Sequence, residues 1–330
     1  MNLQMRIDFA ARLGEYILSN TSEWQEAKQR ASLINPWFIP EFTDIAAENI
    51  AKHFLDTQKL IDWISSYTPD LLQAKKVGII MAGNIPLVGF HDLLCVFMAG
   101  HQAIIKPSSK DEVLTKHLVE KLSEWNSGII ELITFQDMLK GCDAYIATGS
   151  NNSARYFEYY FNKYPHIIRR NRTSVAVLNG KESSDELEKL ADDVHLYFGM
   201  GCRNVTKIFV PKGYNFIPMI SVFKKYDHFK DHHKYKNNYD YNLALHILNG
   251  KFYMSNESII LVENSSIFSP ISQLNYEFYT DKNVVAETLR SLADLQCAVG
   301  HNYIPFGQAQ TPSLTDYADG IDTVNFLTHL

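Results

Sequence analysis

The feature that most constrains the fold of this sequence is a series of short apolar runs separated by helix-like segments. The apolar runs occur at residues 77–81, 103–105, 129–135, 144–147 and 174–178. Helical spacing of apolar side chains marks the segments between them, at residues 87–98, 110–125 and 152–164. Because parallel strands need crossover helices, this alternation is typical of a parallel sheet covered on both faces. It predicts a doubly wound α/β domain in the first half of the chain.

The rest of the chain predicts a helical beginning and a second α/β region. Residues 3–67 carry helix-spaced apolar residues, in two groups separated by Pro36 and Pro40. A predicted helix over residues 185–197 leads into a strand over 205–210. We therefore expect three parts, which are the N-terminal helices with a Rossmann-like cofactor-binding domain (1–195), a catalytic α/β domain (196–300), and a C-terminal return and candidate oligomerisation segment (301–330).

Composition narrows the class of protein. The chain has 330 residues and a formal charge of -6, which argues against a general nucleic-acid binder. Its longest apolar region, 77–105, is interrupted by Asn84, Pro86, His91 and Asp92, so it falls short of a membrane span. The four cysteines show no disulfide framework and no zinc spacing, as suits a reducing compartment. We expect a cytoplasmic protein without a metal.

Cys202 is the candidate nucleophile. It follows Gly199-Met200-Gly201 between a predicted helix and a predicted strand, where small neighbours let a substrate carbonyl approach the thiol. Cys95 and Cys297 lie in apolar helical patterns and Cys142 lies beside a strand start, where buried cysteines are common. The alternative for Cys202 is likewise a buried structural thiol.

Three turns at the ends of predicted strands carry the other candidates. Asn84 follows the first strand, where its amide can donate to an oxyanion. Lys106 ends the second strand at the edge where α/β sheets bind ligands. Thr148-Gly149-Ser150 ends the fourth strand and offers backbone N–H groups to an anion. The structural alternatives are a turn residue for Asn84, a solvated strand end for Lys106 and a helix cap for Gly149-Ser150. Neither a G-x-G-x-x-G nor a Walker sequence is present.

In order and spacing, these turns and Cys202 resemble the aldehyde dehydrogenase superfamily. The matching segments are Asn84-Ile85-Pro86 (N-F-P), Lys106-Pro107-Ser108 (K-P-[SA]), Thr148-Gly149-Ser150 (T-G-S), Asn179-Gly180-Lys181 (G-G-K), Gly199-Met200-Gly201-Cys202 (G-Q-x-C) and Pro305-Phe306-Gly307 (P-F-G). The short chain, residues 167–177 and Ile304-Pro305-Phe306-Gly307 resemble the LuxC-type acyl-CoA reductase branch. The resemblance implies two doubly wound α/β domains with an N-terminal helical segment. It also implies a homo-oligomer, with residues 323–330 as the candidate remnant of a strand arm.

Departures from the superfamily pattern favour reduction over oxidation. Val177 stands where oxidising members place the glutamate that activates a deacylating water, and Ser266 where they place a glutamate for the nicotinamide ribose. Because valine is no general base, a thioester on Cys202 would resist hydrolysis. The resemblance then implies that Cys202 attacks a fatty acyl-CoA while Asn84 and the Cys202 N–H hold the oxyanion. A nicotinamide hydride would reduce the acyl-cysteine to an aldehyde.

The resemblance also implies a set of cofactor-binding residues, namely Lys106, Ser108, Ser109, Lys110, Thr148, Gly149, Ser150 and Phe306. Superfamily members often carry a glutamate at the position of Ser109, where it binds the adenosine ribose and repels a 2′-phosphate. Ser109 followed by Lys110 therefore favours NADPH over NADH. Arg203 is the candidate cation beside the thiol.

Other functions stay open at this point. The chain could be an acyl carrier or acyltransferase that uses Cys202 without hydride transfer. It could also be a non-catalytic member of the superfamily. Within the same class of enzyme, the substrate could be an acyl phosphate instead of an acyl-CoA. An acyl-donating or aldehyde-consuming enzyme is a candidate partner. Two interpretations are open for Arg169, Arg170 and Arg172. They could contact the phosphates of coenzyme A or of the cofactor, or they could be solvated residues where a strand begins. The Lys- and His-rich residues 224–241 predict an exposed polar loop or irregular helix without a metal site.

Overall fold

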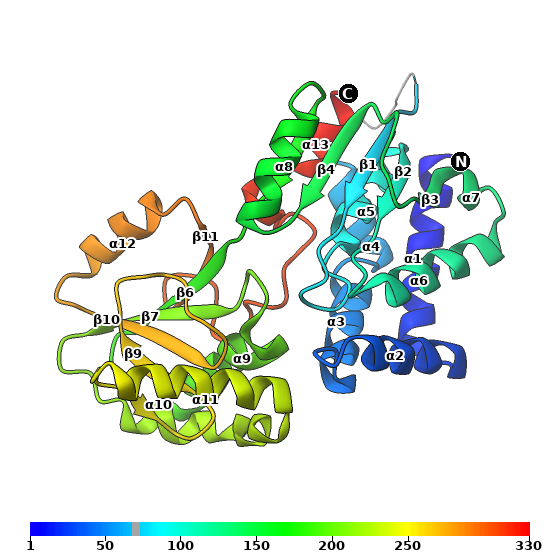
Figure 1. The fold of residues 1–330 in the computed structure, drawn as a ribbon. Helices are drawn as coiled ribbons and strands as arrows, with labels where there is room; N and C mark the ends of the chain where they lie inside the picture. The colour runs from blue at the N-terminus through cyan, green and yellow to red at the C-terminus, as the bar shows by residue number, and fades with distance from the viewer. Residues whose placement is uncertain (68–72) are drawn as a thin grey trace. The chain divides into compact units, whose positions relative to one another are not determined.

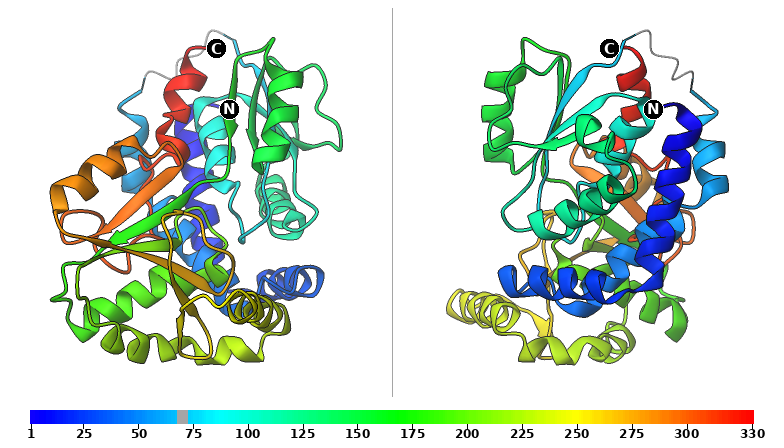
Figure 2. Two further views of the ribbon diagram at one scale, coloured as in Figure 1. Left: turned by 60° about the vertical axis from the view of Figure 1, so that its left-hand side comes forward. Right: turned by 90° about the vertical axis from the view of Figure 1, so that its right-hand side faces the viewer.

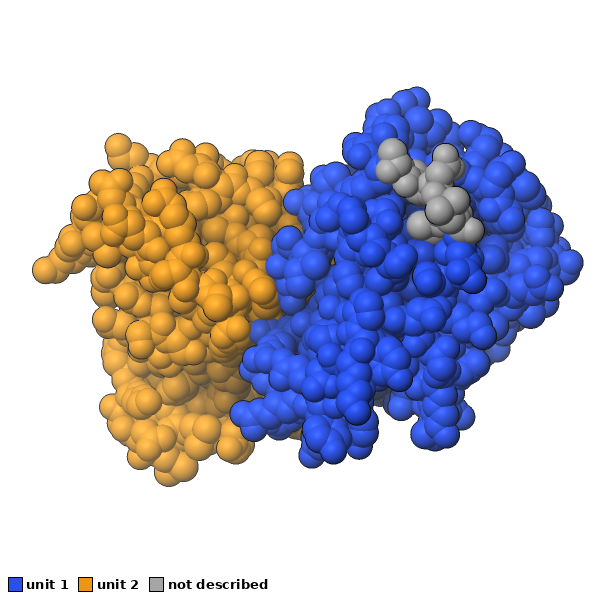
Figure 3. Space-filling model, turned by 90° about the horizontal axis from the view of Figure 1, so that it is seen from above, with its two compact units in different colours: residues 1–171, 312–330 blue, residues 172–311 orange. Residues whose placement is uncertain are grey.

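The structure is a computed structural model that describes residues 1–67 and 73–330. The chain divides into two compact units, coloured separately in Figure 3. Unit 1 contains residues 1–171 and 312–330, and unit 2 contains residues 172–311. The sequence prediction placed a boundary between residues 195 and 196. The contacts place the division earlier because the strand that begins at Thr173 pairs within the sheet of unit 2.

Unit 1 begins with the predicted helical segment. Its four helices, drawn in blue in Figure 1, are α1 (Leu3–Ser19), α2 (Ser22–Ile34), α3 (Pro40–His53) and α4 (Thr57–Ile64). Side chains of Asn2, Thr21 and Asp56 accept a backbone N–H at the starts of α1, α2 and α4. Helix α3 starts instead with Pro40, whose missing N–H costs nothing in a first turn.

The sheet of unit 1 has five parallel strands in the order β3-β2-β1-β4-β5. Their bounds are β1 (Lys76–Ile80), β2 (Gln102–Lys106), β3 (Ile133–Phe135), β4 (Ala144–Thr148) and β5 (His166–Arg169). The strand order reverses between β1 and β4, and open α/β sheets bind ligands at the carboxyl ends of strands at such a point. The turns after β1, β2 and β4 carry the predicted residues of unit 1.

Helices connect these strands, with bounds α5 (Phe90–Ala99), α6 (Glu112–Trp125), α7 (Ile129–Leu132) and α8 (Asn151–Phe161). The apolar run at 129–135 was expected to be one strand, but it forms α7 followed by β3. Strand β5 was not predicted, and the run at 174–178 belongs to the other sheet. Short apolar runs do not by themselves distinguish a buried helical turn from a strand.

Residues 312–330 return to complete unit 1. They include a short 3-10 helix (Ala318–Gly320) and α13 (Thr323–Thr328), which packs on α5. Val324 and Leu327 are fully buried, and the indole N–H of Trp63 donates to the hydroxyl of Tyr317 at 2.8 Å. The segment considered as a strand-arm remnant is therefore a helix in the core of its own unit.

Arg169 of β5 supports this return. Its guanidinium pairs with Asp92 of α5 at 2.7 Å and donates to Thr323 at 2.8 Å and to the carbonyl of Ala318. Arg169 is 2% exposed, so it is neither a solvated residue nor a free phosphate contact. Its neighbour Arg170 is exposed and pairs with Glu158.

The sheet of unit 2 has the strand order β11-β6-β7-β10-β9-β8, with β8 antiparallel to β9 and all other pairs parallel. The bounds are β6 (Thr173–Val177), β7 (Val205–Pro211), β8 (Met254–Ser255), β9 (Ile260–Glu263), β10 (Gln273–Tyr279) and β11 (Leu295–Gly300). Cys297, expected in a helical pattern, lies in β11 at the edge of this sheet. Its strand was hidden because Gln296 interrupts the apolar pattern.

Helices cover both faces of this second sheet. They are α9 (Ser184–His195), α10 (Ile217–Val222), α11 (His233–Leu248) and α12 (Lys282–Ser291), with 3-10 helices at Leu196–Gly199 and Phe223–Asp231. Figures 1 and 2 show α12 on one side of the strands and α9 to α11 on the other. The polar stretch 224–241 is helical, with Phe229 and Tyr235 buried. Within residues 1–67 and 73–330, no helix combines the length and apolar character needed to cross a membrane.

Candidate functional site

The turn after β1 places Asn84 at the surface of unit 1. Asn84 is exposed, whereas Pro86 and Leu87 behind it are buried. Leu87 has a φ of 56°, a left-handed conformation that is costly for a branched side chain. Its N–H donates to the carboxylate of Asp111 at 2.6 Å. This hydrogen bond holds the turn in its strained form.

Asp111 departs from the usual behaviour of a residue at a helix start. It precedes α6, but its carboxylate does not cap that helix and instead accepts the N–H of Leu87. Its second oxygen, Oδ1, is buried without a hydrogen-bond partner among the described residues. Burial raises the pKa of the Asp111 carboxyl well above its usual range, and the hydrogen bond from Leu87 offsets this only in part.

The turns after β1 and β2 touch each other at Gly83. A Cβ added to Gly83 would lie 2.5 Å from the hydroxyl oxygen of Ser108 and 3.2 Å from Cβ of Lys110. Glycine is therefore required for this approach. The structure thus brings the Asn84 turn together with two of the predicted cofactor residues.

The turn after β2 is ordered by its own hydrogen bonds. The N–H of Lys110 donates to the hydroxyl of Ser108 at 3.3 Å, and Asn35 donates to the carbonyl of Lys110 at 3.3 Å. Lys106, Ser109 and Lys110 are exposed at the carboxyl edge of the sheet. Ser108 therefore stabilises the turn, while the two lysines offer positive charge to solvent.

The turn after β4 is the least available to an anion. The N–H of Gly149 already donates to the carbonyl of Arg169 at 3.2 Å, and the hydroxyl of Ser150 accepts the N–H of Ser153 at 3.2 Å as the cap of α8. A Cβ on Gly149 would meet Phe157 and Ser153 at 2.9 Å. Gly149 thus lets α8 pack closely, and Thr148 ends the strand beside it.

In unit 2, the turn that carries Cys202 begins with an unusual backbone. After α9 ends, Tyr197, Phe198 and Gly199 have φ values of 56°, 55° and 74°, all left-handed. Tyr197 and Phe198 are buried, so packing maintains a conformation that each side chain disfavours. Cys202 follows in a partly exposed position just before β7.

Asn204 fastens this turn to the end of α9. Its side-chain oxygen accepts the N–H of Gly201 at 2.8 Å, and its amide nitrogen donates to three carbonyls at 2.8–3.4 Å. Those carbonyls belong to Asp193 and Val194 in the last turn of α9 and to Leu196 directly after it, where helix carbonyls lack intrahelical partners. Asn204 is fully buried. One side chain therefore caps the helix and positions the residues around Cys202.

Asp193 ties the same helix to the P-F-G segment. Its two carboxylate oxygens accept the N–H groups of Gly307 at 2.7 Å and Ala309 at 3.0 Å. Burial raises the pKa of Asp193 to about 7, although these two N–H groups lower it. Arg203, the candidate cation, donates to the carbonyl of Ala309. Phe306 is buried and meets His301 edge-on at a ring distance of 5.7 Å.

Ser174 of β6 links the two cysteines of this unit. Its hydroxyl lies 3.1 Å from the carbonyl oxygen of Cys202 and 3.0 Å from the thiol sulfur of Cys297. The register of β6 shifts against β7 and against β11 beside Ser174. Such irregularities are frequent next to active sites, where they redirect side chains.

The positions that depart from the superfamily pattern are also defined. Val177 packs in an apolar cluster with Val175, Phe209 and Leu289. Ser266 belongs to a turn after β9, where its hydroxyl accepts the N–H of Phe268 at 3.1 Å. A carboxylate at Val177 would lie in an apolar environment.

Sequence reasoning missed the side chains that hold both turns, namely Asp111, Asp193, Asn204 and Ser174. The sequence offers no periodic signal for them, because each looks like an ordinary polar residue of a helix, a strand or a turn. Asn84 with Ser108 and Lys110 lie in unit 1, and Cys202 with Phe306 lie in unit 2. The functional roles of these residues stay predictions.

A sequence profile matches half of the chain. The profile of the family described as acyl-CoA reductase (LuxC) matches residues 54–218. The matched range contains Asn84, Cys202 and the three predicted turns of unit 1. No protein with a curated description matches the chain.

Solved structures confirm the predicted fold class. Aldehyde dehydrogenase KauB from Pseudomonas aeruginosa is 14% identical, with a TM-score of 0.65 over 91% of this chain and 72% of that chain. An oxidoreductase from Marinobacter aquaeolei is 10% identical, with a TM-score of 0.67 over 91% and 73%. A variant of aldehyde dehydrogenase C from Pseudomonas syringae, in complex with NAD+ and octanal, is 12% identical, with a TM-score of 0.65 over 91% and 72%. The chain therefore has an aldehyde dehydrogenase-like α/β fold.

Proposed function

The chain belongs to the acyl-CoA reductase (LuxC) family, and from that premise we propose that it reduces a fatty acyl-CoA thioester to an aldehyde with NADPH. Family and fold make it an oxidoreductase that acts on aldehydes. In the proposed reaction, acyl-CoA, NADPH and a proton give aldehyde, coenzyme A and NADP+.

Cys202 forms the covalent intermediate in this proposal. Its thiolate bonds to the thioester carbonyl carbon, the bond from that carbon to the sulfur of coenzyme A breaks, and the departing thiolate takes a proton. The N–H of Cys202 and the amide of Asn84 donate to the oxyanion, and each such donor contributes about 3 kcal/mol to lowering the barrier. NADPH, which the predicted cofactor-binding residues of unit 1 would hold, would supply the hydride that the acyl carbon takes up. The bond to Cys202 then breaks, which releases the aldehyde and restores the thiolate.

The observation that carries the proposal is the position of Cys202 on a partly exposed turn held by a fully buried asparagine. A thiol fixed in this way can attack a carbonyl carbon and be released again in a constant geometry. Val177 packs in the apolar cluster beneath α12, on the face of β6 opposite the one from which Ser174 contacts Cys202, so a base at this position would not act on an acyl group at Cys202. The case for reduction over hydrolysis rests on the match to the acyl-CoA reductase family.

The residues of unit 1 fit a dinucleotide. The Asn84 turn lies beside the reversal of strand order, and Gly83 lets it approach the turn that bears Ser108 and Lys110. Lys106 and Lys110 would attract phosphates, and Ser109 places no carboxylate against a 2′-phosphate. These features favour NADPH.

The direct test follows both products and the adduct. Purified protein is incubated with dodecanoyl-CoA and NADPH while NADPH oxidation, coenzyme A and aldehyde are quantified. We expect one aldehyde and one coenzyme A per NADPH oxidised. Without NADPH, mass spectrometry should find a dodecanoyl adduct on Cys202.

Two matched cysteine variants control this test. Cys202→Ala should lose the adduct and the aldehyde, whereas Cys297→Ala should keep both. An adduct without NADPH oxidation would replace the reductase with an acyl carrier or acyltransferase. Absence of any adduct would indicate a non-catalytic member of the family.

A further inference from the structure

Unit 2 contains a pocket of about 500 Å³ that the proposed reaction does not use. Its walls are one face of α12, the carboxyl end of β6 with residues 178–179, Leu295 and Ala298 of β11, and the loop of residues 301–303. This volume is within the range of small-molecule sites. All lining residues belong to one compact unit.

The pocket combines an apolar floor with a basic wall. The floor includes Val177, Leu289 and Ala298, which also belong to or pack against the apolar cluster beneath α12. Lys282 and Arg290 stand on the pocket face of α12, two turns apart. In the described chain, neither cation makes an ion pair or hydrogen bond, and no acidic side chain lines the pocket.

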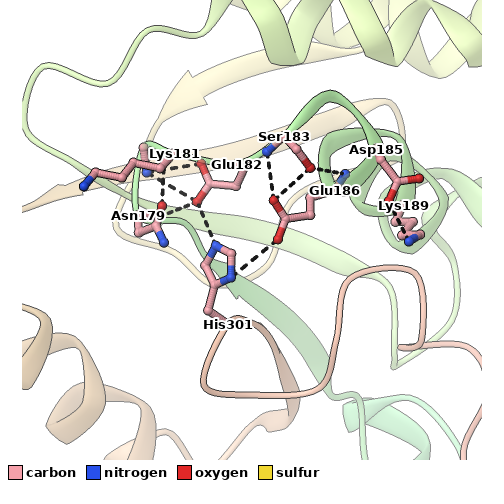
Figure 4. Close-up of polar contacts among 9 residues, drawn as sticks. Asn179, Lys181, Glu182, Ser183, Asp185, Glu186, Lys189 and His301 are labelled. Carbon is pink, nitrogen blue, oxygen red and sulfur yellow. Dashed lines mark hydrogen bonds and ion pairs between the residues drawn. The ribbon is translucent and has the colours of Figure 1, made fainter.

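His301 adds a third polar group at the rim. Its ring lies 3.5 Å from a carboxylate oxygen of Glu186 and 3.9 Å from one of Glu182, as Figure 4 shows. Glu182 is itself fixed by the N–H groups of Asn179 and Gly180. The two carboxylates therefore orient the imidazole, which lines the pocket beside the basic wall.

The pocket and the peptide group of Cys202 contact opposite faces of β6. Val175 and Val177 point toward α12, as members of its apolar cluster. Ser174 directly precedes Val175 and therefore lies on the other face in the alternation of the strand, where its hydroxyl contacts the carbonyl of Cys202 and the thiol of Cys297. A ligand in the pocket would therefore be separated from the Cys202 turn by the sheet.

We infer that this pocket binds an organic anion with an apolar tail, whose carboxylate or phosphate meets Lys282 and Arg290 while its tail covers the floor. A neutral molecule would leave the basic wall unpaired, and a small inorganic anion would leave the apolar floor in water. Only a ligand with both parts matches both surfaces.

The test measures binding by titration calorimetry with octanoate, octyl phosphate, octanol and inorganic phosphate. Octanoate or octyl phosphate should bind, and whichever is tighter identifies the headgroup. Lys282→Glu and Arg290→Glu should each weaken that binding about fivefold or more, as expected for lost exposed charge pairs. Ala286→Phe, which fills the pocket without changing charge, should weaken it as well.

Lys251→Glu is the matched control, because Lys251 is an exposed lysine of unit 2 outside the pocket. It should bind as the unchanged protein does. Cys202→Ala should also keep the affinity, which separates this site from the proposed catalytic one. Equal affinity for octanol, no binding of either amphiphilic anion, or wild-type affinity in the pocket variants would overturn the inference.

Discussion

The turn with Asn84 in unit 1 and the turn with Cys202 in unit 2 both contain strained backbone, but different contacts hold them. Both contain left-handed residues other than glycine, Leu87 in the first and Tyr197 with Phe198 in the second. Both depend on a buried aspartate whose pKa is raised by burial. Strained backbone of this kind persists only where surrounding contacts hold it.

The two turns differ in how completely they are held. One carboxylate oxygen of Asp111 accepts the N–H of Leu87, and the other oxygen has no partner in the described chain. Asp193 uses both oxygens, and Asn204 adds four further contacts around Cys202. The thiol turn and the helix beside it are therefore held by more side-chain hydrogen bonds than the amide turn.

The largest expected effect comes from Asn204→Ala. The change leaves the N–H of Gly201 and the last carbonyls of α9 without their partner, so we expect a loss of about 3–5 kcal/mol in the free energy of unfolding. Acylation of Cys202 should slow more than about 100-fold, because the thiol is no longer positioned. Urea unfolding and adduct formation measure the two effects.

Asn242→Ala is the control for that variant. Asn242 is also a buried asparagine of unit 2, but among the described residues its side chain donates only to the carbonyl of Ile271, at 3.0 Å. It should cost less stability and leave acylation unchanged. Equal loss of acylation in both variants would mean that Asn204 does not position the thiol.

Asp193→Asn should change how stability depends on pH. Because the pKa of Asp193 is about 7 in the folded chain, against an ordinary value of 3.8, the folded state binds more protons than the unfolded state between these values. Its contribution to stability is therefore present below about pH 4 and is lost as pH rises to 7, a change on the order of 4 kcal/mol. Urea unfolding from pH 4 to 8 should show this loss in the unchanged protein and not in the variant.

His195 does not disturb that comparison. Burial lowers its pKa to about 4, so its contribution to stability is lost as pH falls below about 6.5, which is the opposite direction. It titrates in both proteins, and the difference between them isolates Asp193. A constant difference across the pH range would show that Asp193 titrates normally.

Asp111→Ala should have a smaller effect than the changes around Cys202. It removes one acceptor from the N–H of Leu87, at a cost of about 1–2 kcal/mol. Aldehyde formation should slow as the Asn84 turn loses its position, while Asp111→Asn, which keeps an acceptor oxygen, should restore most of the rate. If Asp111→Ala destabilises as strongly as Asn204→Ala, the two turns are held equally and the comparison fails.

Lys110→Glu should have the smallest effect, because it should weaken the binding of NADPH and leave the acylation step unchanged. Placing a carboxylate beside Gly83 should raise the KM for NADPH about tenfold by repelling phosphate. Acylation of Cys202 without NADPH should be unchanged. Lys140→Glu, an exposed lysine of unit 1 in another loop, is the control and should alter neither quantity.

The sequence predicted where the turns lie better than what holds them. Strand and helix patterns are local, so they located Asn84 after β1 and Lys106 at the end of β2. Strand β5 was missed because its Arg169 suggests a solvated position, and only pairing with Asp92 explains its burial. The membership of β6 in the second sheet depends on partners far along the chain.

The supporting side chains could not be predicted for a related reason. Asp193 and Asn204 look like ordinary polar residues of a helix and a turn, and their roles arise from contacts with residues 307–309 and with the end of α9. Hydrogen bonds of this kind follow from tertiary packing and leave no periodic signal in the sequence.

The return of residues 312–330 to unit 1 has a consequence for synthesis on the ribosome. Residues 172–311 are complete as a unit before α13 and Tyr317 have been translated, whereas the core around Trp63 and α5 needs both. Because domains generally fold as units during translation, unit 2 can fold first. The place that Tyr317 and α13 fill in the core of unit 1 stays open until residues 312–330 have been translated.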